Sequence, residues 1–229
     1  MRSFLILALG LALAAPSAAQ QMTGSLDPTD STRDGGELFD AHTIKVTDTR
    51  KLTVRMESPL FDTYLIVRSP SGVETVNDDF DGQEVSQVEV WATEPGEWTV
   101  LASQYSSEGG GAYTLDVTQG PIARLEVTEG RLDYADQVAL KGEFYDTHTW
   151  EASAGDQVIF ELLSLGFDGY LVVTSPSGRV WRNDDAGSTR IARVGPVAAA
   201  GKWRIDVTSN AVDETGAYDL RVIVLPKVD

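Results

Sequence analysis

The 229-residue chain contains no cysteine. Disulfide bonds, thiol nucleophiles and thiolate metal sites are therefore excluded, and the stability of the fold must come from its buried cores. Histidine is almost as scarce, with only two in the chain. Neither histidine has a second histidine nearby in the sequence, so a zinc site is not indicated.

Long apolar runs are also scarce. Residues 4–15 form an apolar run of about 12 residues, which is shorter than the roughly 20 residues of a membrane-spanning helix. Arg2 precedes this run, and the small residues Ser17 and Ala19 follow it, which is typical of a secretory signal peptide. The sequence therefore predicts a signal peptide over residues 1–19, a periplasmic or secreted mature protein, and no membrane span. The alternative is an uncleaved anchor.

Positive charge is low relative to negative charge, and the formal net charge is -17 at pH 7. Such a chain repels nucleic acid and anionic membrane surfaces, and it favours cationic partners or divalent metals. The simpler alternative is that the acidity only keeps an exported protein in solution.

The most informative feature is an internal duplication. Residues 61–79 recur as residues 167–185 at unchanged spacing, and both segments carry Phe-Asp-x-Tyr-Leu, Ser-Pro-Ser-Gly and Asn-Asp-Asp. A period of about 100 residues indicates a tandem of whole domains, because solenoid repeats run at about 20 to 50 residues. We therefore predict two domains, copy one (residues 20–119) and copy two (residues 120–229), which meet near residues 119–121. Each is large enough to bury its own core.

Within each copy, hydrophobic and polar residues alternate. Trp203, Ile205 and Val207 share one face of an expected strand, and the segments that open with Gly111 and Gly216 show the same period of two. Turn-forming Gly, Pro, Asn and Asp separate these segments every eight to twelve residues or so. The pattern predicts an all-β fold of two tandem antiparallel β-sandwich domains, jelly-roll-like in character.

The order of these motifs resembles the bacterial pre-peptidase C-terminal (PPC) domain. The matching pieces are an opening Gly-x-Leu, Asp-x-His-Thr at residues 40–43 and 146–149, the repeated segments already described, and a closing Gly-x-Tyr-x-Leu-x-Val. Ala-Gly-Asp-Gln at residues 154–157 also matches, whereas copy one departs from the pattern with Asp-Thr-Arg-Lys at residues 48–51. The resemblance covers nearly all of residues 22–225.

The resemblance implies a non-catalytic module. In collagenases the related domain binds collagen and calcium, and elsewhere it serves secretion, targeting or attachment to substrate. Residues 20–229 leave no room for a protease domain of ordinary size. We therefore expect no enzymatic activity, no catalytic residue and no required cofactor.

Acidic residues cluster at matching places in the two copies. They are Asp62, Asp78, Asp79 and Asp81 in copy one, and Asp168, Asp184 and Asp185 in copy two. Calcium takes six to eight oxygen ligands, so these carboxylates are candidate calcium ligands, although their spacing is not that of an EF-hand. The alternative is turn chemistry alone, because Asn and Asp hydrogen-bond their own backbone.

The histidines and one tryptophan lead to two further predictions. His42 and His148 occupy the same place in the two copies, which favours a structural hydrogen bond, with the Asp two residues earlier as a candidate partner. Trp181 lies between two arginines and is a candidate for stacking on a sugar ring or a peptide. The alternative for Trp181 is a buried position that closes the sandwich.

These observations predict an exported binding module that attaches to a protein or polysaccharide partner, with calcium as a possible aid. A periplasmic chaperone, or an inhibitor of a co-secreted protease, is the alternative. A β-sandwich hydrolase is disfavoured because it needs a pair of carboxylates about 5 to 9.5 Å apart in one cleft, which a duplicated fold makes awkward.

Overall fold

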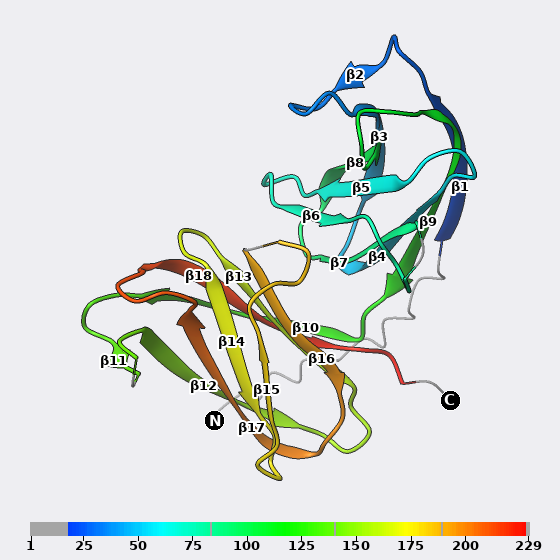
Figure 1. The fold of residues 1–229 in the computed structure, drawn as a ribbon. Coiled ribbons are helices and arrows are strands. Elements are labelled where there is room, and N and C mark those ends of the chain that lie inside the picture. Colours follow the sequence, from blue (N-terminus) through cyan, green and yellow to red (C-terminus); the bar gives the residue numbers. More distant parts are fainter. Residues whose placement is uncertain (1–17, 83, 140, 189, 228–229) are drawn as a thin grey trace, which may run out of the picture.

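The computed structural model describes residues 18–227, except residues 83, 140 and 189. The chain is all-β, as the sequence predicted, and Figure 1 shows two antiparallel sandwiches, with copy one above copy two. No helix in this described part is long and apolar enough to cross a membrane. The expected signal peptide falls almost wholly outside the described residues.

The two copies share one order of strands. The strands of copy one are β1 (Ala18–Leu26), β2 (Ser31–Thr32), β3 (Leu38–Val46), β4 (Arg50–Glu57), β5 (Thr63–Arg68), β6 (Glu74–Asn77), β7 (Ser86–Ala92), β8 (Gly96–Gln104) and β9 (Gly111–Pro121). The strands of copy two are β10 (Arg124–Leu132), β11 (Gln137–Val138), β12 (Phe144–Ala152), β13 (Val158–Ser164), β14 (Gly169–Thr174), β15 (Val180–Asn183), β16 (Ile191–Val197), β17 (Gly201–Ser209) and β18 (Gly216–Val224).

Each sandwich pairs a four-stranded sheet with a five-stranded one. The sheets of copy one have the orders β1-β9-β4-β7 and β2-β3-β8-β5-β6. Those of copy two have the orders β10-β18-β13-β16 and β11-β12-β17-β14-β15. Strand β9 runs to Pro121, so the expected junction at residues 119–121 is itself part of a strand, and only two residues separate it from the start of β10 at Arg124.

The alternating residues form the two cores. In β17, Trp203, Ile205 and Val207 are buried in the core of copy two, and in β9 Leu115 and Val117 are buried in the core of copy one. Each large apolar side chain that is fully buried contributes about 1.5–3 kcal/mol of hydrophobic free energy. The cores therefore supply the stability that disulfides provide in many small secreted domains.

A buried tyrosine explains the opening Gly-x-Leu motif. A Cβ atom added to Gly24 would overlap the ring of Tyr113. The Tyr113 hydroxyl donates a hydrogen bond to Asp40 Oδ2 at 2.6 Å and lies 2.7 Å from His42 Nε2. Because a hydroxyl has one proton to donate, the imidazole Nε2–H must donate to the tyrosine oxygen.

The same arrangement occurs in copy two. Tyr218 packs on Gly130, donates to Asp146 Oδ2 at 2.6 Å and lies 2.8 Å from His148 Nε2. Burial, together with the bond to Asp146, raises the pKa of Tyr218 well above its ordinary value, so the hydroxyl remains a donor. Each histidine therefore bonds the tyrosine, and the tyrosine bonds the aspartate that we had expected to bond the imidazole directly.

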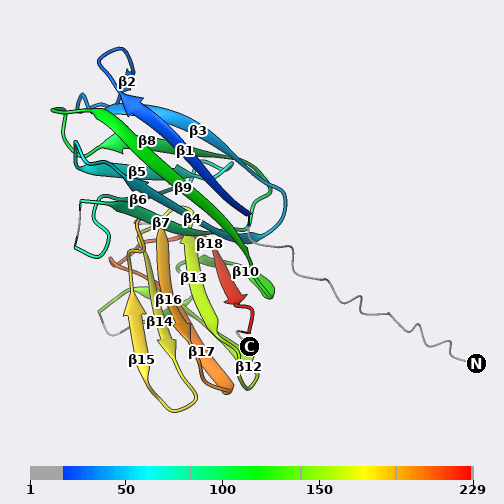
Figure 2. The same cartoon turned by 90° about the vertical axis from the view of Figure 1, so that its right-hand side faces the viewer.

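The two copies meet at the outer face of the four-stranded sheet of copy two. Every residue of β13 is buried, whereas the equivalent strand β4 alternates between buried and partly exposed positions. Ile159 packs with Trp91 of copy one, and Leu163 packs with Val73 of copy one. Figure 2 shows β4 and β7 of copy one directly above β13 and β18 of copy two.

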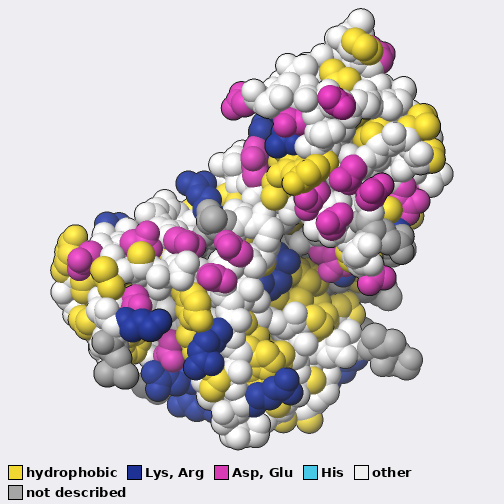
Figure 3. All heavy atoms as spheres, in the orientation of Figure 1, with side chains coloured by type: hydrophobic (Ala, Val, Ile, Leu, Met, Phe, Trp, Pro, Cys, Tyr) yellow, Lys and Arg dark blue, Asp and Glu magenta, His cyan; other side chains and the backbone are white. Residues whose placement is uncertain are grey.

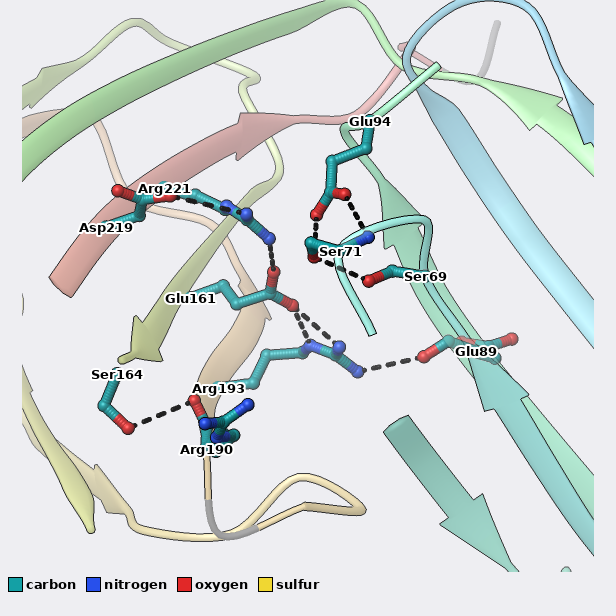
Figure 4. A network of polar contacts seen from close by, with 10 residues as sticks. All are labelled: Ser69, Ser71, Glu89, Glu94, Glu161, Ser164, Arg190, Arg193, Asp219 and Arg221. Carbon is teal, nitrogen blue, oxygen red and sulfur yellow. Dashed lines mark hydrogen bonds and ion pairs between the residues drawn. The ribbon is translucent and has the colours of Figure 1, made fainter. Parts of the chain in front are cut away.

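A buried ion network lies in this boundary. Glu161 is 2 % exposed and accepts hydrogen bonds from Arg193 Nε at 2.9 Å and from Arg221 Nη1 at 3.4 Å (Figure 4). Arg193 Nη1 also donates to the backbone oxygen of Glu89 in copy one at 3.2 Å. One carboxylate thus pairs with two cations, of which Arg221 also lies 3.5 Å from Asp219, and Arg193 connects this network to the other copy.

Glu161→Gln tests this network. The substitution removes the carboxylate that Arg193 and Arg221 share, and Arg221 keeps only its longer contact with Asp219 at 3.5 Å, so we expect the free energy of unfolding to fall by about 3–5 kcal/mol. Urea denaturation measures it. Arg55, the residue of copy one at the same place in β4, pairs with Glu57 near the surface. Arg55→Gln is the control and should cost about 1 kcal/mol or less. Equal losses in the two variants would contradict the role given to Glu161.

Candidate functional site

The outer face of the five-stranded sheet of copy two carries a row of aromatic residues. Tyr145 in β12 pairs with Thr208 in β17, and Thr208 pairs with Tyr170 in β14. Directly paired residues on adjacent strands project to the same face of a sheet, so the two tyrosines flank the threonine. Tyr145 is held in place by a hydrogen bond from its hydroxyl to Gln137 Oε1 at 2.8 Å.

The next rows carry charge. Val172 lies between Asp206 and Arg182, with which it pairs on its two sides. Arg204, two residues before Asp206 in β17, donates from Nε to both oxygens of Asp206, at 2.9 and 3.0 Å. These bonds raise the pKa of Arg204 and orient its guanidinium along the sheet.

These rows line a groove of about 510 Å³. Further lining comes from the turn that follows β11 and from the end of β17. The lining residues are Ala139, Lys141, Glu143, Tyr145, Tyr170, Val172, Arg182, Arg204, Asp206, Thr208, Ser209 and Asn210. The groove is large enough to accept part of a ligand and combines aromatic, cationic and hydroxyl groups.

The groove is cationic within an acidic protein. Copy one has 18 acidic and 6 basic residues, whereas copy two has 17 acidic and 11 basic residues. Figure 3 shows most of the visible Lys and Arg side chains over copy two, and a group of Asp and Glu side chains over copy one. The lining itself holds three cationic side chains and two carboxylates. The two copies therefore differ in electrostatic character although they share a fold.

The same turn precedes the five-stranded sheet in both copies. Arg33 N donates to Glu37 O at 2.8 Å in copy one, and Ala139 N donates to Glu143 O at 2.8 Å in copy two. Arg33 and Ala139 therefore occupy equivalent positions. The Arg33 guanidinium lies over the Tyr64 ring, 4.2 Å from its centroid, whereas alanine leaves the equivalent Tyr170 uncovered on this side.

A second difference opens the other side of the groove. Tyr105 N donates to Asp62 O, and Asn210 N donates to Asp168 O, both at 2.9 Å, so these two residues are also equivalent. The Tyr105 ring lies 6.4 Å from the Tyr64 ring, whereas Asn210 turns its amide to Asp168 Oδ2 at 3.2 Å. Two side-chain differences on one backbone thus leave Tyr170 without the two neighbours that Tyr64 has, and Tyr170 lines the groove.

The structure brings Asp78 and Asp79 of copy one close enough to Asp62 to act on its carboxyl group. Burial first, and then the charges of Glu84, Asp79 and Asp78, raise the pKa of Asp62. Asp81, the remaining acidic residue of this turn, adopts a left-handed backbone conformation with φ 57°. The carboxylates lie close enough to repel one another.

Copy two repeats the acidic cluster. Burial raises the pKa of Asp185, and the charges of Asp168 and Asp184 raise it further. Turn chemistry accounts for the asparagine that begins each Asn-Asp-Asp. Asn77 Nδ2 donates to Asp79 O at 2.9 Å, and Asn183 Nδ2 donates to Asp185 O at 3.0 Å.

No group of three or more His, Cys, Asp or Glu side chains in the described part of the chain is placed to hold a metal ion. A cation at either acidic turn would therefore need backbone oxygens and water among its ligands.

Trp181 lies against the core of copy two. Its ring is 5.7 Å from that of Trp203, and the Arg179 guanidinium lies over it at 4.7 Å from the centroid. This packing corresponds to the alternative in which the tryptophan closes the sandwich. It does not line the groove, although its neighbour Arg182 does.

Sequence reasoning missed the groove residues Tyr145, Arg182 and Arg204. Tyr170 belonged to the repeated Phe-Asp-x-Tyr-Leu motif, but the sequence led to no prediction for the tyrosine itself. The available signal was the difference between the copies, with alanine at position 139 where copy one has Arg33.

Neither a protein-family model nor a curated protein matches the chain. Among solved structures, the crystal structure of the STIV MCP is 9% identical with a TM-score of 0.28, and covers 93% of this chain and 98% of that one. A chain in the atomic structure of Sulfolobus Turreted Icosahedral Virus is 11% identical to this chain with a TM-score of 0.25, and the match covers 90% of this chain and 61% of that one. The major capsid protein P2 from bacteriophage PM2 is 9% identical with a TM-score of 0.24, over 92% and 99%. Similarities at this level say nothing about function.

The acidic turns predict a dependence of stability on pH. A raised carboxyl pKa means that the folded state binds the proton more tightly than the unfolded state, so ionised Asp62 lowers stability as pH rises above about 4. Asp62→Asn should therefore raise the melting temperature at pH 7 by about 1–2 °C and by less near pH 4. Scanning calorimetry at the two pH values measures the difference.

Asp27 provides a control, because its ionised carboxylate should affect the stability of the fold in the opposite direction. Hydrogen bonds from Thr29 lower its pKa, so its ionised form stabilises the fold above the unfolded pKa. Asp27→Ala should lower the melting temperature at pH 7. A fall for Asp62→Asn at both pH values would contradict the repulsion described here.

Proposed function

We propose that this chain is an exported, non-catalytic binding module of two PPC-like sandwiches, and that copy two attaches it to a protein or polysaccharide partner. The observation that carries the proposal is the open groove on copy two. In copy one the equivalent tyrosine has Arg33 over its ring and Tyr105 beside it, whereas Tyr170 of copy two has alanine and asparagine at these places and lines the groove.

The chemistry of the groove favours binding over turnover. Both oxygens of Asp206 accept hydrogen bonds from Arg204, and the Tyr145 hydroxyl is bonded to Gln137. These groups are thus engaged in holding the surface in shape. Two tyrosines on rigid strands supply broad contact area at a low cost in side-chain entropy, as binding surfaces generally do.

A panel of immobilised glycans and proteins, including cell-wall polysaccharides and gelatin, tests this function. The mature chain should be retained by at least one member, and Tyr170→Ala should weaken retention by about tenfold. Tyr64→Ala, the matched change in copy one, should leave retention unchanged. Equal effects of the two variants, or hydrolysis of any member of the panel by the wild-type chain, would contradict the proposal.

Calcium is the second part of the proposal, supported by the mutual repulsion at the acidic turns. A divalent cation bound only by the folded state at about 100 times its Kd stabilises that state by about 2.7 kcal/mol. The melting temperature in excess calcium should therefore be higher than in chelator. The difference should be lost in the double variant Asp78→Ala, Asp184→Ala. Equal melting temperatures in calcium and in chelator would contradict calcium binding and would leave the turns with a structural role only.

A further inference from the structure

We propose that the groove of copy two binds an anionic polysaccharide that carries carboxylates on its sugar rings. The sugar rings lie on Tyr145 and Tyr170, and the carboxylates meet Arg182 and Arg204. This inference rests on the proposed function, because it names the chemical class of partner for the same groove.

The aromatic row suits sugar rings. Tyr145 and Tyr170 lie on strands β12 and β14, on either side of β17, so they are separated by about 10 Å, or two strand spacings. Thr208 between them offers a hydroxyl, which donates to Phe144 O at 2.7 Å and keeps its lone pairs available. Sugar rings present apolar C–H faces to tyrosine and hydroxyls to such groups.

The cations are placed beside the tyrosines. Arg182 pairs with Val172, the next outward-facing residue after Tyr170 in β14. The Arg204 guanidinium engages Asp206 through Nε, and its Nη2 donates to Thr147 Oγ1 at 3.4 Å, so its orientation is fixed. A guanidinium presents a planar fork that matches a carboxylate, which favours carboxylated sugars over neutral ones.

The floor of the groove disfavours a peptide. An extended peptide must satisfy its own backbone N–H and C=O groups, and it commonly does so by pairing with a sheet edge. Strand β17 pairs with β12 on one side and β14 on the other, and Tyr145 also pairs with Gln137 of β11, so the floor between the tyrosines offers side chains only. A polysaccharide is satisfied by side chains and bridging water.

The acidic copy one of a second molecule is a competing occupant, because it also carries negative charge. Light scattering at increasing protein concentration separates the two. A monomer is expected. Self-association that Arg182→Ala abolishes would overturn the proposal in favour of this occupant.

Affinity electrophoresis in polygalacturonate, with fully methyl-esterified polygalacturonate as the neutral probe, tests the chemistry. We expect retardation in the first gel, a weaker effect at high salt, and little retardation in the second. Arg182→Ala should weaken binding about tenfold. Lys202→Ala removes an exposed cation of β17 that does not line the groove, and it should have little effect.

Ala139→Arg separates shape from charge. The new guanidinium should cover Tyr170 as Arg33 covers Tyr64, so binding should be lost even though a positive charge has been added. Stronger binding by Ala139→Arg, or equal losses in Arg182→Ala and Lys202→Ala, would show attraction by charge alone and would overturn the proposal.

The two proposals fail in different ways. Equal binding of the neutral and charged polymers, lost in Ala139→Arg, would overturn the anionic ligand and leave the groove as a binding site. Binding of either polymer that Ala139→Arg does not change would overturn both proposals.

Discussion

The buried carboxylate of Glu161 decides which surfaces of copy two are available. It holds Arg193 and Arg221 at the boundary with copy one, and it is nearly inaccessible to solvent. Arg221 is buried and Arg193 is partly so, and losing the carboxylate that they share would be costly, so the contact between the copies depends on this residue. Once the outer face of the four-stranded sheet is used for docking, the outer face of the five-stranded sheet remains free, and the groove lies there.

The two copies show how one backbone supports different surfaces. The turn at Arg33 and the turn at Ala139 have the same hydrogen bonds, and the Tyr–Asp–His contact recurs at the same place in each sandwich. The fold therefore depends on hydrogen bonds and contacts that both copies contain, whereas the groove depends on side chains that differ between the copies. Function placed on side chains of a duplicated scaffold can diverge without any cost to the cores.

The all-β fold could be predicted because period-two alternation and turn residues are local signals, and β17 shows both. The groove could not, because the covering of Tyr64 depends on Arg33 and Tyr105, which approach from separate connections. The docking of the copies does leave a signal in the sequence: residues 158–164 lack the alternation of their counterparts at 52–58, because β13 is buried on both faces. For Trp181 the sequence left two possibilities, stacking on a ligand or closing the sandwich, and the structure places Arg179 over its ring and Trp203 beside it.

The central claim is that copy two binds and copy one does not, and amide chemical-shift mapping by NMR tests it most directly. The labelled protein would be titrated with short polygalacturonate fragments. The account predicts shifts for the amides of Tyr145, Tyr170 and Arg182, and none for their counterparts Phe39, Tyr64 and Val76. Shifts of equal size in both copies, or shifts confined to copy one, would contradict it.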